Sequence, residues 1–377
     1  MGAGNMQTEW RRLAAHAIVR AIMPSAKPAA ATISCRLGWW VAAAMVTSIL
    51  AFPALLRFRP ERQAPFDQNL LHRLAGRGPQ CVLIGDSMLE SRFDDAVLEA
   101  IAPYRCAVVA QHGSGSGIWY LIFKNLLAAQ ERPPRSVIIL FRDAQLTLPA
   151  WRSTGRYRGT AQKYMPGEEP LFEKIITQAV ERQKSPFERL LHTVYPIQEA
   201  REAAEEKIDK WALALVARRR DYERIRTETN RLFKVANLRH DQSVDESKED
   251  EPLRAADKDA NFDADVRGSF LPPMLEIAKS RGIHLTFFRI KPRPPADNAM
   301  VADSPLQAAY QSALQTYLKD HGALYLDETK DPSVTLAYYG SGDHVAPAMA
   351  RAYAEQFWKT YAGRIEEASG LNGGTAR

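Results

Sequence analysis

Five short apolar runs, spread along most of the chain, constrain its fold more than any other feature. They cover residues 80–84, 106–111, 136–142, 283–290 and 322–326. The first and third are almost uninterrupted in their apolar character, which is typical of strands buried on both faces of a sheet. Helical patterns separate most of the runs. This alternation predicts a doubly wound α/β domain built around a parallel sheet.

Helices are expected between these strands and after the last one. The four intervening segments are 92–102, 117–130, 265–281 and 305–320. A final helix is expected from Pro347, because proline suits the first turn of a helix. Its spacing predicts a buried stripe of Ala350, Tyr353, Phe357 and Tyr361.

Residues 165–262 interrupt this rhythm with a strongly helical stretch. Apolar side chains repeat there at helical spacing, at Ile208, Trp211, Leu215, Tyr222 and Ile225. A solvated acidic loop then leads to the fourth strand. We interpret the segment as a helical insertion or lid between the third and fourth strands. A partner-binding arm remains the alternative.

An uncharged stretch near the amino end, residues 37–56, is twenty residues long. At a rise of ~1.5 Å per residue, such a helix spans the ~30 Å hydrocarbon core of a bilayer. Trp39 and Trp40 at one end and Arg57 at the other suit the two interfaces. A signal peptide is the alternative, but 36 preceding residues are long for its first region. We therefore favour an uncleaved transmembrane anchor.

These patterns divide the chain into six expected parts. They are a basic cytoplasmic tail (1–36), the anchor (37–57), the first part of the α/β domain (63–164), the helical insertion (165–262), the second part of the domain (263–363) and a flexible tail (364–377).

Composition narrows the classes of function. Of the 377 residues, 46% are hydrophobic and 25% charged, as in globular proteins, and the net charge of +6 is too modest to indicate nucleic-acid binding. The nucleotide-binding patterns G-x-x-x-x-G-K-[ST] and strand-linked G-x-G-x-x-G do not occur. The three cysteines lack metal-ligand spacing, so we expect neither a metal nor a cofactor. Whether Cys81 and Cys106 form a disulfide is left open.

Two residues from opposite ends of the domain stand out as candidates for chemistry. Ser87 follows the first strand, and open parallel sheets bind ligands at the carboxyl ends of their strands. His344 lies in a glycine-rich loop between the last strand and the last helix. The sheet can bring that loop over the first strand's turn. In that arrangement Ser87 is the nucleophile and His344 is the base that activates it.

The residues around both candidates carry a family resemblance. "GDS" (residues 85–87), the glycine turn "QHGSGSG" after the second strand and an Asp-His pair before the last helix occur in that order. On these motifs the chain resembles the SGNH, or GDSL-like, hydrolase family over roughly residues 78–160 and 263–362. The resemblance implies a flavodoxin-like three-layer sandwich with a five-stranded parallel sheet. It also implies that Ser87 attacks an acyl carbonyl and that His344 takes its proton.

The oxyanion hole implied by the resemblance departs from the family pattern in one donor. The N–H groups of Ser87 and of the glycine turn are expected to bind the oxyanion, with Gly115 favoured over Gly113. The family usually has an asparagine after the third strand, where this chain has Arg142 and Asp143. Arg142 either donates to the oxyanion or pairs with Asp143.

The acid that orients the histidine also departs from the pattern. The family usually has an aspartate three residues before the histidine, and that position is Ser341 here. Asp343 is the candidate orienting acid. A Ser-His dyad, or an approach by Asp327 or Asp331, is the alternative.

An anchored domain of this type resembles proteins that add or remove acyl groups on exported polysaccharides and cell-wall polymers. Trp119 is expected to stack on a sugar, and Arg289 and Lys291 to hold an anionic polymer. The expected partners are that carbohydrate, the membrane and, for transfer, a membrane-bound acyl donor protein. The expected function is a serine O-acyl esterase or acyltransferase, most simply for acetyl groups. A non-catalytic scaffold subunit of a polysaccharide modification or export complex is the alternative.

Membrane topology gives the first testable prediction. A basic amino tail inside and a large domain outside would make this a single-pass protein of the inner membrane with a periplasmic domain. Alkaline phosphatase fused after residue 377 should therefore be active in intact cells, because that enzyme needs an oxidising compartment for its disulfides. Green fluorescence from a fluorescent protein at the same position, with inactive phosphatase, would instead indicate a cytoplasmic domain.

Overall fold

The computed structural model describes residues 40–41, 43–45, 47, 65–183, 260–340 and 342–371. The chain divides into two units, Met1–Pro60 and Glu61–Arg377. In the first unit the described residues are helical and exposed. No helix among the described residues is long and apolar enough to cross a membrane. Most of the predicted span at 37–56, and the predicted apolar stripe from Ile208 to Ile225, lie outside the described residues.

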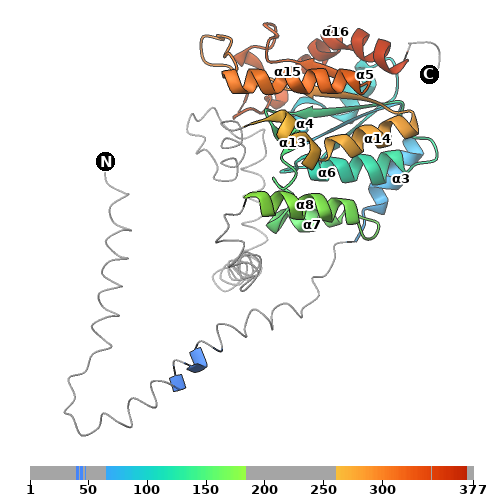
Figure 1. The fold of residues 1–377 in the computed structure, drawn as a ribbon. Coiled ribbons are helices and arrows are strands. Elements are labelled where there is room, and N and C mark those ends of the chain that lie inside the picture. Colours follow the sequence, from blue (N-terminus) through green and yellow to red (C-terminus); the bar gives the residue numbers. More distant parts are fainter. Residues whose placement is uncertain are drawn as a thin grey trace, which may run out of the picture. The chain divides into compact units, whose positions relative to one another are not determined.

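Five strands form one sheet at the centre of the second unit (Figure 1). They are β1 (Cys81–Gly85), β2 (Cys106–Ala110), β3 (Ser136–Phe141), β4 (His284–Arg289) and β5 (Leu324–Asp327). Their order is β2-β1-β3-β4-β5, and every neighbouring pair is parallel. The predicted α/β fold with a five-stranded parallel sheet is confirmed. The strand order is that of flavodoxin-like doubly wound folds.

Strand β1 lies between β2 and β3, which explains its uninterrupted apolar sequence. All five of its residues are buried, as are all six of β3. Cys81 opposes Cys106 on β2, and both are free thiols in this structure. A hydrogen bond with Cys81, together with burial, raises the pKa of the Cys106 thiol. The two cysteines therefore act as small buried side chains in the core.

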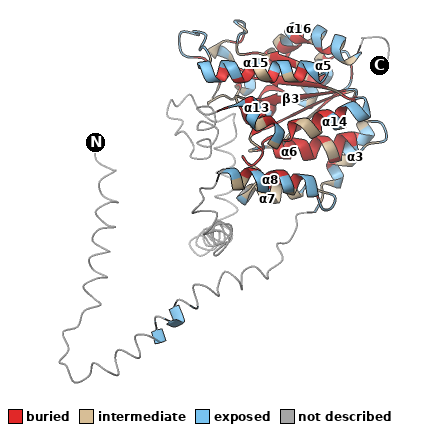
Figure 2. Cartoon of the chain, in the orientation of Figure 1, coloured by how far each residue is buried: buried red, intermediate tan, exposed pale blue. Residues whose placement is uncertain are grey.

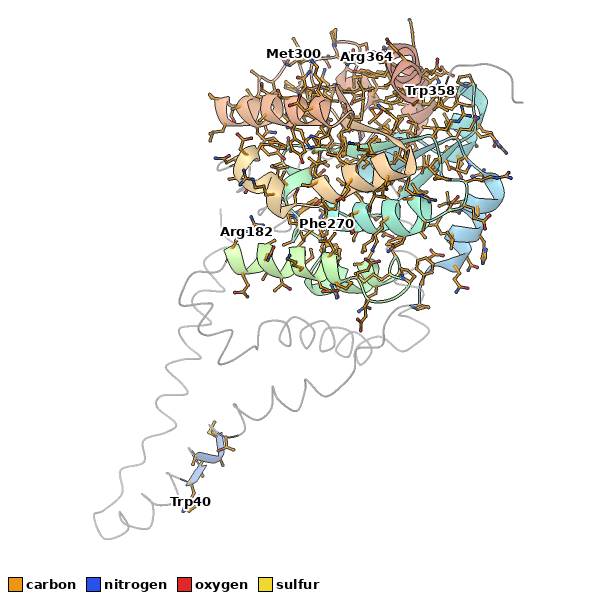
Figure 3. The ribbon with its side chains drawn as sticks, turned by 45° about the vertical axis from the view of Figure 1, so that its right-hand side comes forward. Trp40, Arg182, Phe270, Met300, Trp358 and Arg364 are labelled. Carbon is orange, nitrogen blue, oxygen red and sulfur yellow. The ribbon has the colours of Figure 1, made fainter. Side chains whose placement is uncertain are left out.

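Helices cover both faces of the sheet and enclose two separate apolar cores. One core includes residues of α3 (Gln68–Arg77), α6 (Ser116–Leu121), α14 (Leu271–Arg281) and α15 (Pro305–Asp320). The other includes residues of α4 (Ser87–Arg92), α5 (Asp95–Ile101) and α16 (Ala350–Ser369). Figure 2 shows buried residues, in red, on the sheet and on helices of both layers. Figure 3 labels Phe270 and Trp358, which belong to the two different cores.

The handedness of the connections accounts for this division. The chain steps from β1 to β2 in one direction and then from β2 through β3 and β4 to β5 in the other. Crossovers between parallel strands are almost always right-handed. The β1–β2 connection, with α4 and α5, must therefore lie on the face opposite α6, α14 and α15.

Further helical elements complete the second unit as the structure describes it. The helix after β2 continues as a π-helix over Ile122–Ala128. The remaining α-helices are α7 (Arg158–Gln162), α8 (Pro170–Gln183) and α13 (Phe262–Asp265). Short 3₁₀ helices occupy Gln145–Thr147, Gly155–Tyr157, Val266–Gly268, Leu336–Tyr338 and Pro347–Met349.

The helix predicted at 92–102 is wrong in its bounds, because two helices occupy this region. Helix α4 begins at Ser87, since the Asp86 carboxylate caps it by accepting a hydrogen bond from the Met88 N–H at 2.8 Å. Asp94 caps α5 in the same way by accepting from Val97. The aspartate of "GDS" is thus a helix cap.

The last helix largely follows its predicted stripe. Tyr353, Phe357 and Tyr361 are buried as expected, and Ala354, Trp358 and Ile365 join them. Ala350, by contrast, is only half-buried. It stands at the first position of α16, directly after the 3₁₀ turn.

Close packing at the end of β1 predicts a cost for any side chain at Gly85. A Cβ there would lie 2.8 Å from the Leu89 Cβ of α4 and 3.4 Å from the Leu140 Cβ of β3. Gly85→Ala should therefore lower the free energy of unfolding by about 1–3 kcal/mol, as measured by urea denaturation. Gly167→Ala is the control, because nothing lies within 4 Å of its added Cβ. Equal stability of the two variants would contradict this packing.

Candidate active site

Ser87 stands at the junction of β1 and α4. It is the first residue of the helix, and its side chain is half-buried, whereas the capping Asp86 is 5% exposed. The cap fixes the first turn, so the backbone of Ser87 is held by both the strand before it and the helix after it. A serine at this position presents its hydroxyl at the carboxyl edge of the sheet.

His344 lies on a tight loop between β5 and α16. Tyr339 and Val345 pair across the loop as an antiparallel bridge, and the Gly340 N–H donates to the His344 carbonyl at 2.8 Å. This pairing carries the imidazole to the start of α4. The His344 Nε2 is 3.0 Å from the Ser87 Oγ, although 257 positions separate the two residues.

That distance is suitable for proton transfer. A general base needs a heavy-atom distance of about 2.6–3.2 Å to the proton donor. With Nε2 unprotonated, the imidazole accepts the Ser87 O–H and can take its proton when Oγ attacks. The two residues proposed from sequence as nucleophile and base therefore lie in contact.

The glycine turn after β2 lies against the end of β1. The Gln111 N–H donates to the Gly85 carbonyl at 3.0 Å, and the Ser114 Oγ lies 3.4 Å from the same oxygen. Gly113 has a φ of +63°, a conformation that favours glycine. Gly115 is buried, and a Cβ there would lie 2.6 Å from the Trp151 carbonyl oxygen. Packing against Trp151 is thus a sufficient reason for glycine at 115.

The backbone N–H groups at this edge supply donors. Within residues 65–183, 260–340 and 342–371, the N–H groups of Ser87, Gly113 and Gly115 have no hydrogen-bond acceptor. Such groups are available to an oxyanion formed next to Ser87. Which glycine serves in this way stays a prediction.

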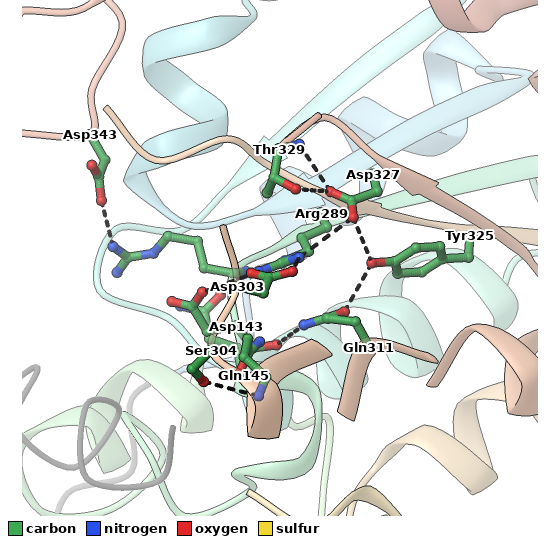
Figure 4. Close-up of polar contacts among 12 residues, drawn as sticks. Asp143, Gln145, Arg289, Asp303, Ser304, Gln311, Tyr325, Asp327, Thr329 and Asp343 are labelled. Carbon is green, nitrogen blue, oxygen red and sulfur yellow. Dashed lines mark hydrogen bonds and ion pairs between the residues drawn. The ribbon is translucent and has the colours of Figure 1, made fainter. Parts of the chain in front are cut away.

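Arg142 follows β3 and pairs with the His344 loop. Its Nη1 lies 2.9 Å from the Asp343 Oδ2, whereas its backbone N–H donates to the Gln145 Oε1 (Figure 4). Arg142 thus forms an ion pair with Asp343, and its two alternative roles, as donor to the oxyanion or as partner of Asp143, stay predictions. The guanidinium reaches across the edge of the sheet to the residue that precedes the candidate base.

The three aspartates considered as orienting acids are held by other groups. The second oxygen of Asp343 accepts the Arg293 N–H at 2.9 Å. Asp327 accepts from Thr329 and Tyr325, and Asp331 accepts from Ser333. Ser341, at the family's usual acid position, lies outside the described residues. The orienting role of Asp343 stays a prediction.

The three residues predicted to bind substrate are buried, which corrects that prediction. Trp119 is fully buried, and its indole N–H donates to the Ser114 Oγ at 2.8 Å. Lys291 is 6% exposed and donates from Nζ to the Asp331 carbonyl at 2.7 Å. Arg289 is 3% exposed. None of the three offers a surface for a sugar or a polymer.

Arg289 instead organises a cluster of aspartates beside the site (Figure 4). It forms a two-pronged ion pair with Asp303, at 2.8 and 2.5 Å, and reaches Asp327 at 3.5 Å. Hydrogen bonding to Arg289 holds the pKa of the Asp303 carboxyl below its ordinary value. Asp143 lies 4.0 Å from Arg289, and burial raises its pKa despite nearby arginines. Asp143 also has a left-handed φ of +46°.

The sequence prediction missed two residues, Ser91 and Arg92, at the far end of α4. Both contact the backbone of the His344 loop. The signal available was their spacing of four and five from Ser87 on one helix. The sequence prediction did not start a helix at Ser87, so it could not place these two residues on the same helix as the serine.

Among the described residues, no group of three or more His, Cys, Asp or Glu side chains could hold a metal ion. The groups that the site does bring together are a hydroxyl, an imidazole and backbone donors. These suit nucleophilic attack on a carbonyl followed by proton transfer.

Comparisons with known proteins add little to this geometry. No protein-family model matches the chain, and no curated protein matches its sequence. Among solved structures, a Bacteroides fragilis protein described as a "putative acylhydrolase" is similar over 80% of this chain and 97% of its own. The identity is 10% and the TM-score 0.35, so this likeness carries no argument.

The Arg289 cluster generates a prediction for pH-dependent stability. The pKa of Asp303 is lower in the folded protein than in the unfolded chain. Its carboxylate therefore adds to the free energy of unfolding at any pH above the unfolded-state pKa. This contribution is lost as the pH falls through the folded-state pKa. Asp303→Asn should lower the free energy of unfolding by about 2–3 kcal/mol at neutral pH. This is less than the loss on breaking a fully buried ion pair, because Asp303 is partly exposed. The difference from wild type should narrow on acidification.

Denaturant titrations over a pH series measure this difference. Asp320→Asn is the matched control, since Asp320 is exposed at the far end of α15, the helix that follows Asp303. If the free energy of unfolding of Asp303→Asn falls short of wild type by the same amount at every pH, the charge of the carboxylate is not what stabilises the cluster.

Proposed function

We propose that the protein is a serine O-acyl esterase or acyltransferase that works through an acyl-enzyme on Ser87. The observation that carries the proposal is the 3.0 Å contact between the Ser87 Oγ and the His344 Nε2. Further support comes from its place, at the carboxyl edge of a parallel sheet and beside N–H groups that have no acceptor in the described chain.

The first half of the reaction forms the acyl-enzyme. The Ser87 Oγ attacks the acyl carbonyl carbon while its proton passes to the His344 Nε2, and the carbonyl oxygen becomes an oxyanion. When the tetrahedral intermediate collapses, the ester bond to the alcohol breaks. The leaving alkoxide takes the proton from the imidazolium and departs as a free hydroxyl.

The second half releases the acyl group. His344 now takes a proton from an incoming hydroxyl, which attacks the acyl carbon, and Ser87 leaves with that proton. Water as the attacking group gives hydrolysis, and a sugar hydroxyl gives transfer. The two activities share every residue of the site and differ only in the acceptor.

Backbone donors stabilise the oxyanion in both halves. The Ser87 N–H and one N–H of the glycine turn, from Gly115 or Gly113, are the proposed pair. Removal of a single donor of this kind typically costs about 3 kcal/mol of transition-state stabilisation. Arg142 is the proposed third donor, and its pairing with Asp343 limits how far the guanidinium can turn.

An exported or cell-envelope carbohydrate is the proposed substrate, with an acetyl group as the simplest acyl group. Support comes from the apolar stretch at 37–56 and from the motifs shared with the SGNH family. The same stretch supports a single-pass inner-membrane location with the domain in the periplasm, where transfer would draw on a membrane-bound acyl donor. Because Trp119, Arg289 and Lys291 are buried, substrate recognition must depend on other side chains.

A non-catalytic scaffold subunit is the competing function. A degenerate site would have no reason to keep the serine hydroxyl and the imidazole in hydrogen-bond contact, so this contact favours catalysis. The scaffold function becomes the better one if the serine proves unreactive.

Covalent labelling tests the proposed function. The full chain in detergent, treated with a fluorophosphonate, should carry one adduct at Ser87, because an activated serine attacks the phosphorus as it would a carbonyl. Ser87→Ala should abolish labelling, and His344→Ala should slow it at least ~100-fold, the usual contribution of a general base. Peptide mapping by mass spectrometry locates the adduct.

Ser114→Ala serves as a control for loss of a serine at the same edge. Ser114 is buried and bonded to Trp119 and Gly85, so it should not be the labelled residue. If wild-type protein that is folded by circular dichroism stays unlabelled at Ser87, the catalytic proposal fails and the scaffold function replaces it.

A further inference from the structure

Helix α4 contacts the His344 loop through more than its first residue. At its other end, the Ser91 Oγ accepts the Val345 N–H at 3.2 Å and donates to the Met88 carbonyl at 3.0 Å. Ser91 is 9% exposed. The peptide group that follows His344 is therefore bonded to the helix that carries the nucleophile.

Arg92 makes the corresponding contact on the other side of His344. Its Nη1 donates to the Asp343 carbonyl at 3.1 Å and to the Met88 carbonyl at 3.2 Å. Its Nη2 donates to the Lys291 carbonyl at 3.2 Å, on the loop after β4. One guanidinium thus joins α4 to two loops at the carboxyl edge of the sheet.

These bonds place His344 and Ser87 in a common rigid frame. His344 stands between Asp343 and Val345, so the backbone on both of its sides is attached to α4. That helix is only six residues long, which puts its two ends about 7–8 Å apart at ~1.5 Å per residue. Little intervening structure can flex between the nucleophile and the backbone of the base.

The burial of Arg92 is costly for a purely structural residue. Its side chain is fully buried, and the hydrogen bonds described for it go to three carbonyls and the Tyr353 hydroxyl. The Tyr353 hydroxyl in turn donates to the buried Glu328. Burial alone lowers the pKa of a guanidinium, but the two nearby phenols and Glu328 outweigh it, so Arg92 stays charged.

The surroundings of Arg92 fit a geometric role. Its guanidinium lies 5.3 Å from the Tyr353 ring centre and 5.7 Å from that of Tyr339, which limits its freedom to move. An apolar side chain would fill the same space without the desolvation cost of a charge. What an apolar residue cannot do is donate to several carbonyls at fixed angles.

We propose that Ser91 and Arg92 are positioning residues that set the alignment of His344 with Ser87 by holding the two peptide groups that flank the histidine. The inference rests on the proposed function and adds to it the residues that determine the precision of the proton transfer. Displacements of about 1 Å in such a pair typically cost ~100-fold in rate.

Ser91→Ala tests the proposal with a closely matched control. Ser269 is also buried, donates to the carbonyl three residues before it and accepts one backbone N–H, at 2.7 and 3.2 Å. It precedes α14, whose buried residues belong to the core on the opposite face of the sheet. Both alanine variants of the full chain should lose similar stability, about 0.5–1.5 kcal/mol for one hydrogen bond.

Only Ser91→Ala should slow the reaction. We expect its fluorophosphonate labelling rate and kcat on a soluble acetyl ester to fall ~10-fold with KM unchanged, because the base is misaligned while the binding surface is intact. Ser91→Thr, which keeps the hydroxyl, should restore most of the rate. Equal rates in Ser91→Ala, Ser269→Ala and wild type would overturn the proposal and leave the catalytic function standing.

Arg92→Lys tests the other contact, because lysine keeps the charge but cannot donate in the same fixed directions. The labelling rate and kcat should fall further in Arg92→Lys than in Ser91→Ala. If Arg92→Lys does not fold, the result for Ser91→Ala decides the proposal alone.

A readout independent of activity separates this inference from the proposed function. In ¹⁵N spectra of histidine-labelled protein, the His344 imidazole should shift in Ser91→Ala and not in Ser269→Ala. A shift without any labelling of wild-type Ser87 would retain the positioning role and reject catalysis. An unshifted imidazole would reject the positioning role.

Discussion

The parallel direction of all five strands is the constraint on which the candidate site depends. Because each connection returns the chain through a helix, every strand ends at the same edge of the sheet. Ser87 and the glycine turn reach that edge through β1 and β2, and Arg142 does so through β3. His344 follows β5. Residues spread over most of the domain therefore reach the same edge of the sheet.

Polar groups at this edge mostly hold the loops in place. Arg289 ties β4 to Asp303 and Asp327, and Arg142 ties the loop after β3 to Asp343. Buried ion pairs contribute less to stability than their number suggests, because each charge has first to be stripped of water. Their effect lies in fixing which loop conformation is adopted. The serine hydroxyl and the imidazole in contact with it form the proposed reactive pair at this edge.

Apolar runs made the strands predictable, since β1 and β3 are buried on both faces and contain almost nothing else. The meeting of Ser87 and His344 was predictable because the ends of parallel strands share one edge of the sheet. The failures share another cause. Arg289 ends β4 and Lys291 follows it, but whether such a charge faces solvent depends on partners distant in sequence, such as Asp303 and Asp331. Likewise, the start of α4 depended on the cap by Asp86, a residue equally at home in a turn.

The distance of 257 residues between Ser87 and His344 has a consequence for how the protein is made. A ribosome completes the strand and helix that carry the serine long before it reaches the histidine. Contacts this far apart in sequence also form late, because closing so large a loop costs chain entropy. During synthesis the serine is therefore an ordinary hydroxyl. In the proposed mechanism it becomes a nucleophile only once the loop before α16 has packed, so a chain that ends before His344 would lack the proposed esterase activity.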